Sequence, residues 1–272
     1  METFFSFLEK RVDDCSSLLC VGLDPHIPDL KEPTAASALD FCLDLVKQTA
    51  RYVAAFKPNA AFFEVFGAEG WTALKQVIEA IQEESHRFGS MIPVILDAKR
   101  GDIASTAETY ATSAFENLGA HCITLSPYLG KDSIEPFIQN SEKGVFLLCK
   151  TSNPGSGDLQ DIVLSDGDLL YEHVAKLAQT WNTKNNIGLV VGATHVEATK
   201  RVRAAAPDLW FLAPGVGTQG GELESALKAG LRRDGKGILI PISRGISRAE
   251  RPGLAAAEIR DQILNIRMQL GR

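Results

Sequence analysis

Short apolar runs alternate with longer amphipathic stretches along the whole chain, and this alternation limits the possible fold more than any other feature. The apolar runs have the length and β-branched content of buried strands, and the stretches between them have the spacing of helices that bury one face. The expected strands cover residues 18–23, 53–57, 92–97, 121–125, 144–149, 187–191, 210–213 and 237–242. The expected helices cover residues 36–49, 69–88, 106–118, 133–140, 169–182, 196–206, 222–229 and 255–270.

Eight strands that each precede a helix predict an α/β protein whose parallel sheet closes into a (β/α)8 TIM barrel. We expect a single domain over residues 1–272, because no linker interrupts the alternation. A doubly wound open sheet is the alternative, but no Gly-x-Gly-x-x-Gly motif follows the first expected strand. The number of strands favours the barrel.

Composition narrows the class of protein and its partners. The 272 residues carry a net charge of −6 with acids and bases interspersed, which argues against nucleic acid as a partner. The five cysteines form no Cys-x-x-Cys motif, which favours buried, reduced thiols. The N-terminus lacks a secretory pattern, and no apolar run reaches the length of a membrane span. We therefore expect a soluble cytoplasmic protein with no membrane partner.

Three charged residues, Asp97, Lys99 and Asp102, stand at the end of the third expected strand. Strand alternation places Asp97 and Lys99 on one face, about 7 Å apart along the chain, and Asp102 follows in the next loop. Buried charges are costly unless they pair. We interpret this group as part of a catalytic charge array.

The carboxyl ends of barrel strands meet at one mouth, where active sites lie. Further polar side chains follow other strands there, namely Asp24, Lys57, Ser152, Gln219 and Arg244. Residues 214–221 are rich in glycine, and they and Arg244 follow strands seven and eight, where barrels commonly bind phosphate. Glycines let backbone N–H groups approach an anion, and a guanidinium donates two parallel hydrogen bonds. We expect a phosphate-bearing ligand near Gln219 and Arg244.

Residues 153–168 interrupt the alternation with a long stretch rich in Gly, Asp and Ser after the fifth strand. Loops of this length in a compact domain are lids, binding loops or disordered segments. We interpret this one as a lid over the site.

Metal binding is not expected. The five histidines show no spacing typical of a metal site, and lysines among the carboxylates would compete with a bound cation. Taken singly, each residue at the mouth also has a simpler explanation, such as a turn at Asp24 before Pro25. Their occurrence together at one end of the sheet favours a functional site.

Seven motifs together make the chain resemble the orotidine 5′-phosphate decarboxylase family, in its longer bacterial form, over essentially its whole length. They are VGLDP (21–25), FKPN (56–59), LDAKRGDI (96–103), TLSPY (124–128), KTSNPGS (150–156), PGVGTQGG (214–221) and SRGI (243–246). The Asp-x-Lys-x-x-Asp pattern alone is shared with related phosphosugar decarboxylases and synthases. The motifs around strands one, five and seven are more specific.

The resemblance implies conversion of orotidine 5′-monophosphate to UMP and CO2 without a metal or organic cofactor. It implies a catalytic array of alternating charge in which Lys99 donates the proton, formed by Lys57, Asp97, Lys99 and Asp102. It also implies a homodimer with shared active sites, in which Asp102, Ile103 and Thr106 reach the partner's pocket.

The resemblance further implies the substrate contacts. Asp24 and Lys57 would hold the ribose hydroxyls with help from Thr106, and Ser152 would contact the pyrimidine. Gln219 would bridge toward the phosphate, Arg244 would clamp it, and Pro214 would belong to the same binding surface. Residues 156–168 receive no role, because this segment is longer than in shorter members of the family.

Three alternatives remain open from the sequence. A Mg²⁺-dependent barrel enzyme acting on a sugar phosphate would need a metal. An aldolase would form a Schiff base at Lys99, which the flanking aspartates disfavour because they keep the lysine protonated. A catalytically silent phosphate-ligand sensor on the same fold would have no need of all four charged residues.

Overall fold

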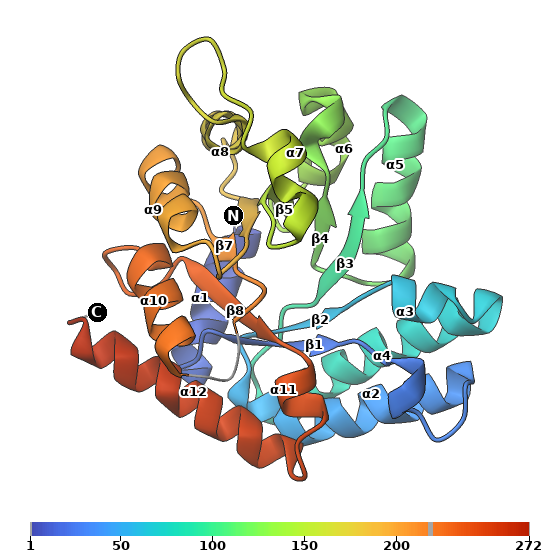
Figure 1. Cartoon of the computed structure of the whole chain (residues 1–272). Coiled ribbons are helices and arrows are strands. Elements are labelled where there is room, and N and C mark those ends of the chain that lie inside the picture. The colour runs from blue at the N-terminus through green and yellow to red at the C-terminus, as the bar shows by residue number, and fades with distance from the viewer. Residues whose placement is uncertain (1, 217–219, 272) are drawn as a thin grey trace.

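In a computed structural model, which describes residues 2–216 and 220–271, eight parallel strands form a barrel with helices around it (Figure 1). The strands follow the order β2-β1-β8-β7-β6-β5-β4-β3 around the sheet. Bridges between Phe56 and Val94 and between Asn59 and Asp97 join the two end strands and nearly close the ring. The predicted (β/α)8 barrel is confirmed, and the extent of the domain stays a prediction.

The strands lie where the alternation predicts them, with small shifts of their boundaries. They are β1 (Leu19–Leu23), β2 (Ala55–Pro58), β3 (Ile95–Arg100), β4 (Cys122–Leu125), β5 (Gly144–Lys150), β6 (Ile187–Val191), β7 (Phe211–Leu212) and β8 (Ile238–Ile242). Most of their residues are buried, because side chains on one face fill the barrel and those on the other meet the helices. All five cysteines are free and buried, as predicted.

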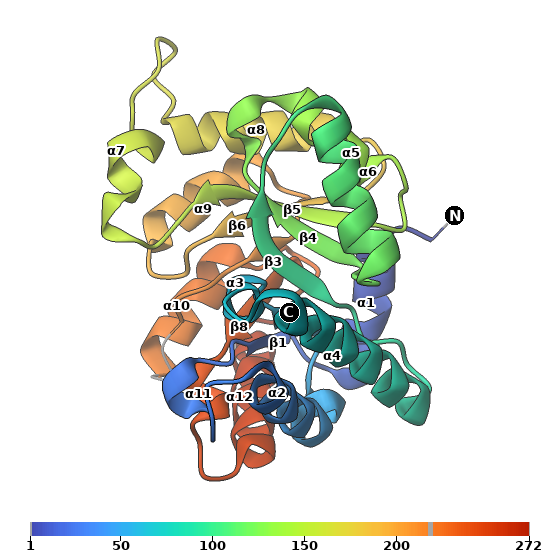
Figure 2. The same ribbon diagram turned by 90° about the vertical axis from the view of Figure 1, so that its right-hand side faces the viewer.

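Helices cover the outside of the barrel, as Figure 2 shows from a second direction. The larger ones are α1 (Phe4–Cys15), α2 (Ala35–Thr49), α4 (Gly67–Phe88), α5 (Ala104–Thr112), α8 (Leu170–Trp181), α9 (Val196–Ala205), α10 (Gly220–Gly230) and α12 (Pro252–Gln269). The short ones are α3 (Ala61–Glu64), α6 (Glu135–Ile138), α7 (Gly157–Gln160) and α11 (Arg244–Ser247). Within residues 2–216 and 220–271, none of them combines the length and hydrophobicity needed to cross a membrane.

Two expected helices differ in extent. The helix expected over 106–118 begins earlier, as α5, and continues as a π-helical turn over Ser113–Asn117. The helix expected over 133–140 is shorter in the structure, where it is α6. A turn in which Lys143 N donates to Asn140 O then leads into β5.

Helix α1, which the alternation did not predict, closes the end of the barrel opposite the carboxyl ends of the strands. Phe4 and Phe5 are fully buried, and the Phe5 ring stacks on Trp210 with 6.2 Å between ring centroids. Gly144, at the start of β5, makes room for this packing, because a Cβ there would lie 2.2 Å from a ring carbon of Phe4. Aromatic side chains therefore fill this end of the barrel.

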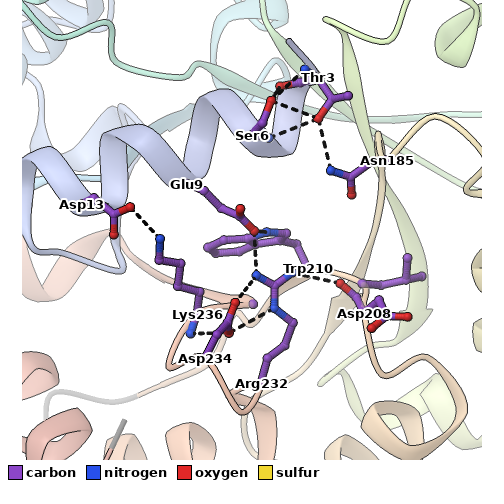
Figure 3. Close-up of polar contacts among 12 residues, drawn as sticks. Thr3, Ser6, Glu9, Asp13, Asn185, Asp208, Trp210, Arg232, Asp234 and Lys236 are labelled. Carbon is purple, nitrogen blue, oxygen red and sulfur yellow. Dashed lines mark hydrogen bonds and ion pairs between the residues drawn. The ribbon is translucent and has the colours of Figure 1, made fainter. Parts of the chain in front are cut away.

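Polar contacts fix α1 in place (Figure 3). Arg232 Nη2 donates to Glu9 Oε1 at 2.6 Å, and Lys236 Nζ donates to Asp13 Oδ2 at 2.6 Å. Both bases lie in the loop before β8, so the ion pairs connect the first helix with the last strand. Helix α1 therefore covers the end of the barrel opposite the carboxyl ends of the strands.

Candidate active site

A hollow of about 800 Å³ opens at the carboxyl ends of the strands. Six of the residues predicted from the sequence line it, namely Asp24, Lys57, Asp97, Lys99, Pro214 and Arg244. Other residues that line the hollow were not predicted from the sequence, among them His26, Asn59, Phe62, Thr124 and Arg248. His26 and Asn59 come shortly after β1 and β2, and this position is the signal that could have identified them.

Asp97 lies between two lysine ammonium groups. Lys57 Nζ is 2.8 Å from Asp97 Oδ2, and Lys99 Nζ is 2.6 Å from Asp97 Oδ1. Thr124, on the neighbouring strand β4, donates its hydroxyl to Asp97 Oδ1 at 3.0 Å. Lys57 and Asp97 are 6% and 9% exposed, so both buried charges are paired. Asp97 on the third strand, Lys99 beside it and Lys57 on β2 therefore form a compact charge cluster.

The cluster keeps both buried partners ionised. Burial raises the pKa of Asp97, but the charges of Lys57 and Lys99 outweigh it and hold the pKa well below its usual range. Burial likewise lowers the pKa of Lys57, but Asp97 and Asp24 outweigh it and raise this pKa above its usual value. At neutral pH the hollow thus presents the ionised carboxylate of Asp97 beside the ionised ammonium of Lys57.

The backbone at Lys99 departs from regular strand geometry. Its φ of 47° lies in the left-handed region, which residues other than glycine rarely adopt. The register of β3 against β4 shifts between Leu96 and Arg100, and Thr124 Oγ1 accepts the N–H groups of Ala98 and Lys99 at 3.0 and 2.9 Å. This bend lets the Lys99 ammonium reach Asp97, and such strain is typical of functional sites.

Asp102, Ile103 and Thr106 lie outside the hollow. Asp102 Oδ1 accepts the N–H of Ile103 at 2.9 Å, and Asp102 forms no ion pair with any residue that the structure describes. The Ile103 side chain is exposed, as is Thr106 at the start of α5. A single chain therefore does not bring Asp102 together with the other three charges.

Asp24 and Arg244 face the hollow without protein partners among residues 2–216 and 220–271. Asp24 Oδ1 is buried and lacks a hydrogen-bond partner there. Arg244 is exposed and forms no ion pair, whereas its neighbour Arg248 binds Asp29 at 3.0 Å. An unpaired acceptor and an unpaired guanidinium are thus available to a ligand.

The two remaining predicted residues stand apart. Ser152 is exposed and lies next to Gly215, which lines the hollow. A Cβ added at Gly215 would lie 3.5 Å from Ser152 Oγ. Gln219 lies outside the described residues, so its place in the site stays a prediction.

A family model described as the orotidine 5′-phosphate decarboxylase / HUMPS family matches residues 17–259. The chain belongs to this family. The orotidine 5′-phosphate decarboxylase of Roseiflexus castenholzii is 47% identical over 97% of this chain and 96% of its own. The orotidine 5′-phosphate decarboxylase of Verminephrobacter eiseniae is 47% identical over 98% of this chain and 97% of its own. The structure of the Leishmania donovani decarboxylase has a TM-score of 0.89 and 53% identity, and covers 98% of this chain and 99% of its own.

Family membership confirms the resemblance predicted from the motifs. The residues matched by the family model include every residue of the hollow named above. In the parts of the chain that the structure describes, no group of three His, Cys, Asp or Glu side chains is placed to hold a metal ion.

Proposed function

We propose that the chain decarboxylates orotidine 5′-monophosphate to UMP and CO2, using the charge array of its barrel mouth and no metal or organic cofactor. The observation that carries this proposal is the buried Asp97 carboxylate between the ammonium groups of Lys57 and Lys99. Relatives named for this activity align over nearly the whole chain, which supports the same assignment.

Lys99 acts as the proton donor. Loss of CO2 leaves a vinyl carbanion whose lone pair lies in the plane of the pyrimidine ring, so the π-system of the ring cannot absorb the charge. An ammonium next to the reacting carbon stabilises the developing negative charge and then delivers its proton. Lys99 suits this role, because its side chain is half-exposed toward the hollow while Asp97 holds its nitrogen in place.

Asp97 opposes the substrate carboxylate. Two like charges 4 Å apart at an effective dielectric constant of 20 repel each other by about 4 kcal/mol. The repulsion disappears as CO2 leaves, so it favours the transition state over the bound substrate. The low pKa of Asp97 keeps this carboxylate ionised at neutral pH.

The other residues bind the rest of the nucleotide. Asp24 and Lys57 hold the ribose hydroxyls, Ser152 contacts the pyrimidine, and Arg244 clamps the phosphate. Pro214 and Gln219 complete the surface on the phosphate side. The unpaired Asp24 oxygen and the unpaired Arg244 guanidinium support this arrangement, since each offers the group that a hydroxyl or a phosphate needs.

The active enzyme is a cytoplasmic homodimer, in which Asp102, Ile103 and Thr106 of each chain complete the partner's site. Their position outside the hollow of their own chain supports this proposal. Asp102 then closes the alternating array of Lys57, Asp97 and Lys99.

We expect the chain to convert orotidine 5′-monophosphate to UMP at the same rate with and without EDTA, followed by ultraviolet absorbance. The reason is that lysine ammonium groups supply both the charge stabilisation and the proton. Treatment with borohydride in the presence of substrate should also leave activity unchanged. Activity lost in EDTA and restored by Mg²⁺ would indicate a metal-dependent relative. A borohydride-trapped adduct at Lys99 would indicate an aldolase, and absence of any turnover would indicate a sensor.

Replacement of Arg244 by alanine should weaken the use of orotidine 5′-monophosphate but leave the use of phosphate-free orotidine nearly unchanged. A charge-assisted hydrogen bond contributes about 1.5–3 kcal/mol, which corresponds to roughly a 10- to 100-fold loss of kcat/KM for the phosphorylated substrate. Steady-state kinetics with both substrates measures the difference. Equal losses for the two substrates would show that Arg244 does not bind the phosphate.

A further inference from the structure

Lys150, the last residue of β5, is a buried charge that the proposed reaction does not use. Its side chain is only 5% exposed. Its Nζ donates to Asp161 Oδ1 at 2.7 Å and to Ser156 Oγ at 3.3 Å, and it lies 5.7 Å from the centre of the Tyr171 ring. Asp161 is its only carboxylate partner within the described residues. A buried ammonium requires such a partner, because an unpaired one is strongly destabilising.

Asp161 belongs to the segment 153–168 that interrupts the β/α alternation. This segment contains α7, and the chain between α7 and α8 projects from the barrel in both views (Figures 1 and 2). A second set of contacts ties it to the strand end. Thr151 N donates to Gln160 Oε1 at 2.9 Å, and Gln160 Nε2 donates to Thr151 Oγ1 at 2.8 Å. The segment is therefore anchored to the end of β5 through α7 and Asp161.

Ser152 lies between the residues that form these anchors. Lys150 and Thr151 precede it, and their partners Ser156, Gln160 and Asp161 follow it. On its other side Ser152 packs on Gly192, where a Cβ would lie 3.0 Å from both the backbone nitrogen and the Cβ of Ser152. The place of Ser152 beside the hollow thus depends on where the segment is held.

We propose that Lys150 is a positioning residue, whose ion pair with Asp161 latches the segment 153–168 onto β5 and thereby fixes Ser152 at the edge of the substrate pyrimidine. The role of Ser152 rests on the proposed function, whereas the latch rests on the contacts alone. Opening the segment at α7 would separate the pair and leave a buried, uncompensated ammonium. The part of the segment around α7 is therefore anchored beside Ser152, and the lid interpretation applies only to the loop beyond it.

The test compares Lys150→Met and Asp161→Asn with a matched control, Lys176→Met. Lys176 also forms an ion pair with an aspartate of the segment, Asp168, but its side chain is 53% exposed against 5% for Lys150, and the pair lies at the far end of the segment. Amide hydrogen exchange over residues 153–164 should become faster in the two latch variants and stay unchanged in the control. Two variants are needed, because Asp161→Asn leaves a buried charge unpaired and Lys150→Met removes that charge altogether.

Kinetics test the positioning role. Misplacing a substrate contact by about 1 Å lowers kcat/KM by roughly 10- to 100-fold, and we expect losses of this size for both latch variants with orotidine 5′-monophosphate. In a Ser152→Ala background the same substitutions should cause little further loss, because the group that they position is already absent. Lys176→Met should have no effect in either background.

Unchanged exchange in both latch variants would overturn the latch. Full additivity with Ser152→Ala would overturn the positioning role, because a purely structural contribution would act whether or not Ser152 is present. If the unaltered chain showed no turnover of orotidine 5′-monophosphate, the proposed function would fail, and hydrogen exchange would still decide whether the latch exists.

Discussion

Replacement of Lys99 by alanine should abolish decarboxylation of orotidine 5′-monophosphate while UMP continues to bind with nearly unchanged affinity. Removal of a preorganised charge typically costs a factor of about 10²–10³ in rate, and loss of a general acid costs about 10²–10⁴. A combined loss of roughly 10⁴-fold or more is expected, because Lys99 supplies both effects. UMP lacks the carboxylate and does not need the proton, so its binding depends on the ribose and phosphate contacts instead.

Single-turnover kinetics and a titration with UMP separate the two effects. Lys200→Ala is a suitable control, because Lys200 is an exposed lysine of α9 that pairs with Glu197 away from the hollow. It should keep full activity. If Lys99→Ala lost UMP affinity and rate by the same factor, Lys99 would be a binding residue rather than the proton donor.

Most of the barrel could be predicted because most strands are buried on both faces. A strand such as β8, whose five residues are all buried, must be a continuous apolar run, and such runs are visible in any sequence. Helix α1 has apolar residues at helical spacing too, at Phe4, Phe5, Leu8 and Val12. It was missed because it precedes the first strand and so has no place in the β/α alternation. Its position at the end of the barrel depends on contacts with residues such as Gly144, which lie far away in the sequence.

The part of the site that is formed by the ends of the strands could be predicted from the sequence. Residues near the carboxyl ends of strands, such as Lys57 and Asp97, meet at the mouth because parallel strands all end there. The left-handed backbone of Lys99 was not predictable, because it depends on the register shift against β4 and on the Thr124 hydroxyl. The direction of Asp102 was not predictable from its own chain either, since the loop that carries it leads away from the hollow toward α5.

Mixing two inactive variants, Lys99→Ala and Asp102→Ala, should restore about a quarter of the activity of the unaltered enzyme, because each site of the proposed dimer takes Lys99 from one chain and Asp102 from the other. The geometry motivates this expectation, since Asp102 lies outside the hollow of its own chain while Lys99 lies inside it. Either variant alone forms dimers in which each of the two sites carries one lesion, and these dimers should be inactive.

Random exchange of subunits makes about half of the dimers hybrid, and every hybrid has one intact site and one site with both lesions. About a quarter of all sites are then intact, and the steady-state rate measures this fraction directly. If Asp102 served the site of its own chain, every site would keep one lesion and the mixture would stay inactive. Co-purification of a tagged variant with an untagged one must show that exchange has taken place. An inactive mixture of exchanged subunits would then rule out the shared site, because a shared site requires one intact site in every hybrid dimer.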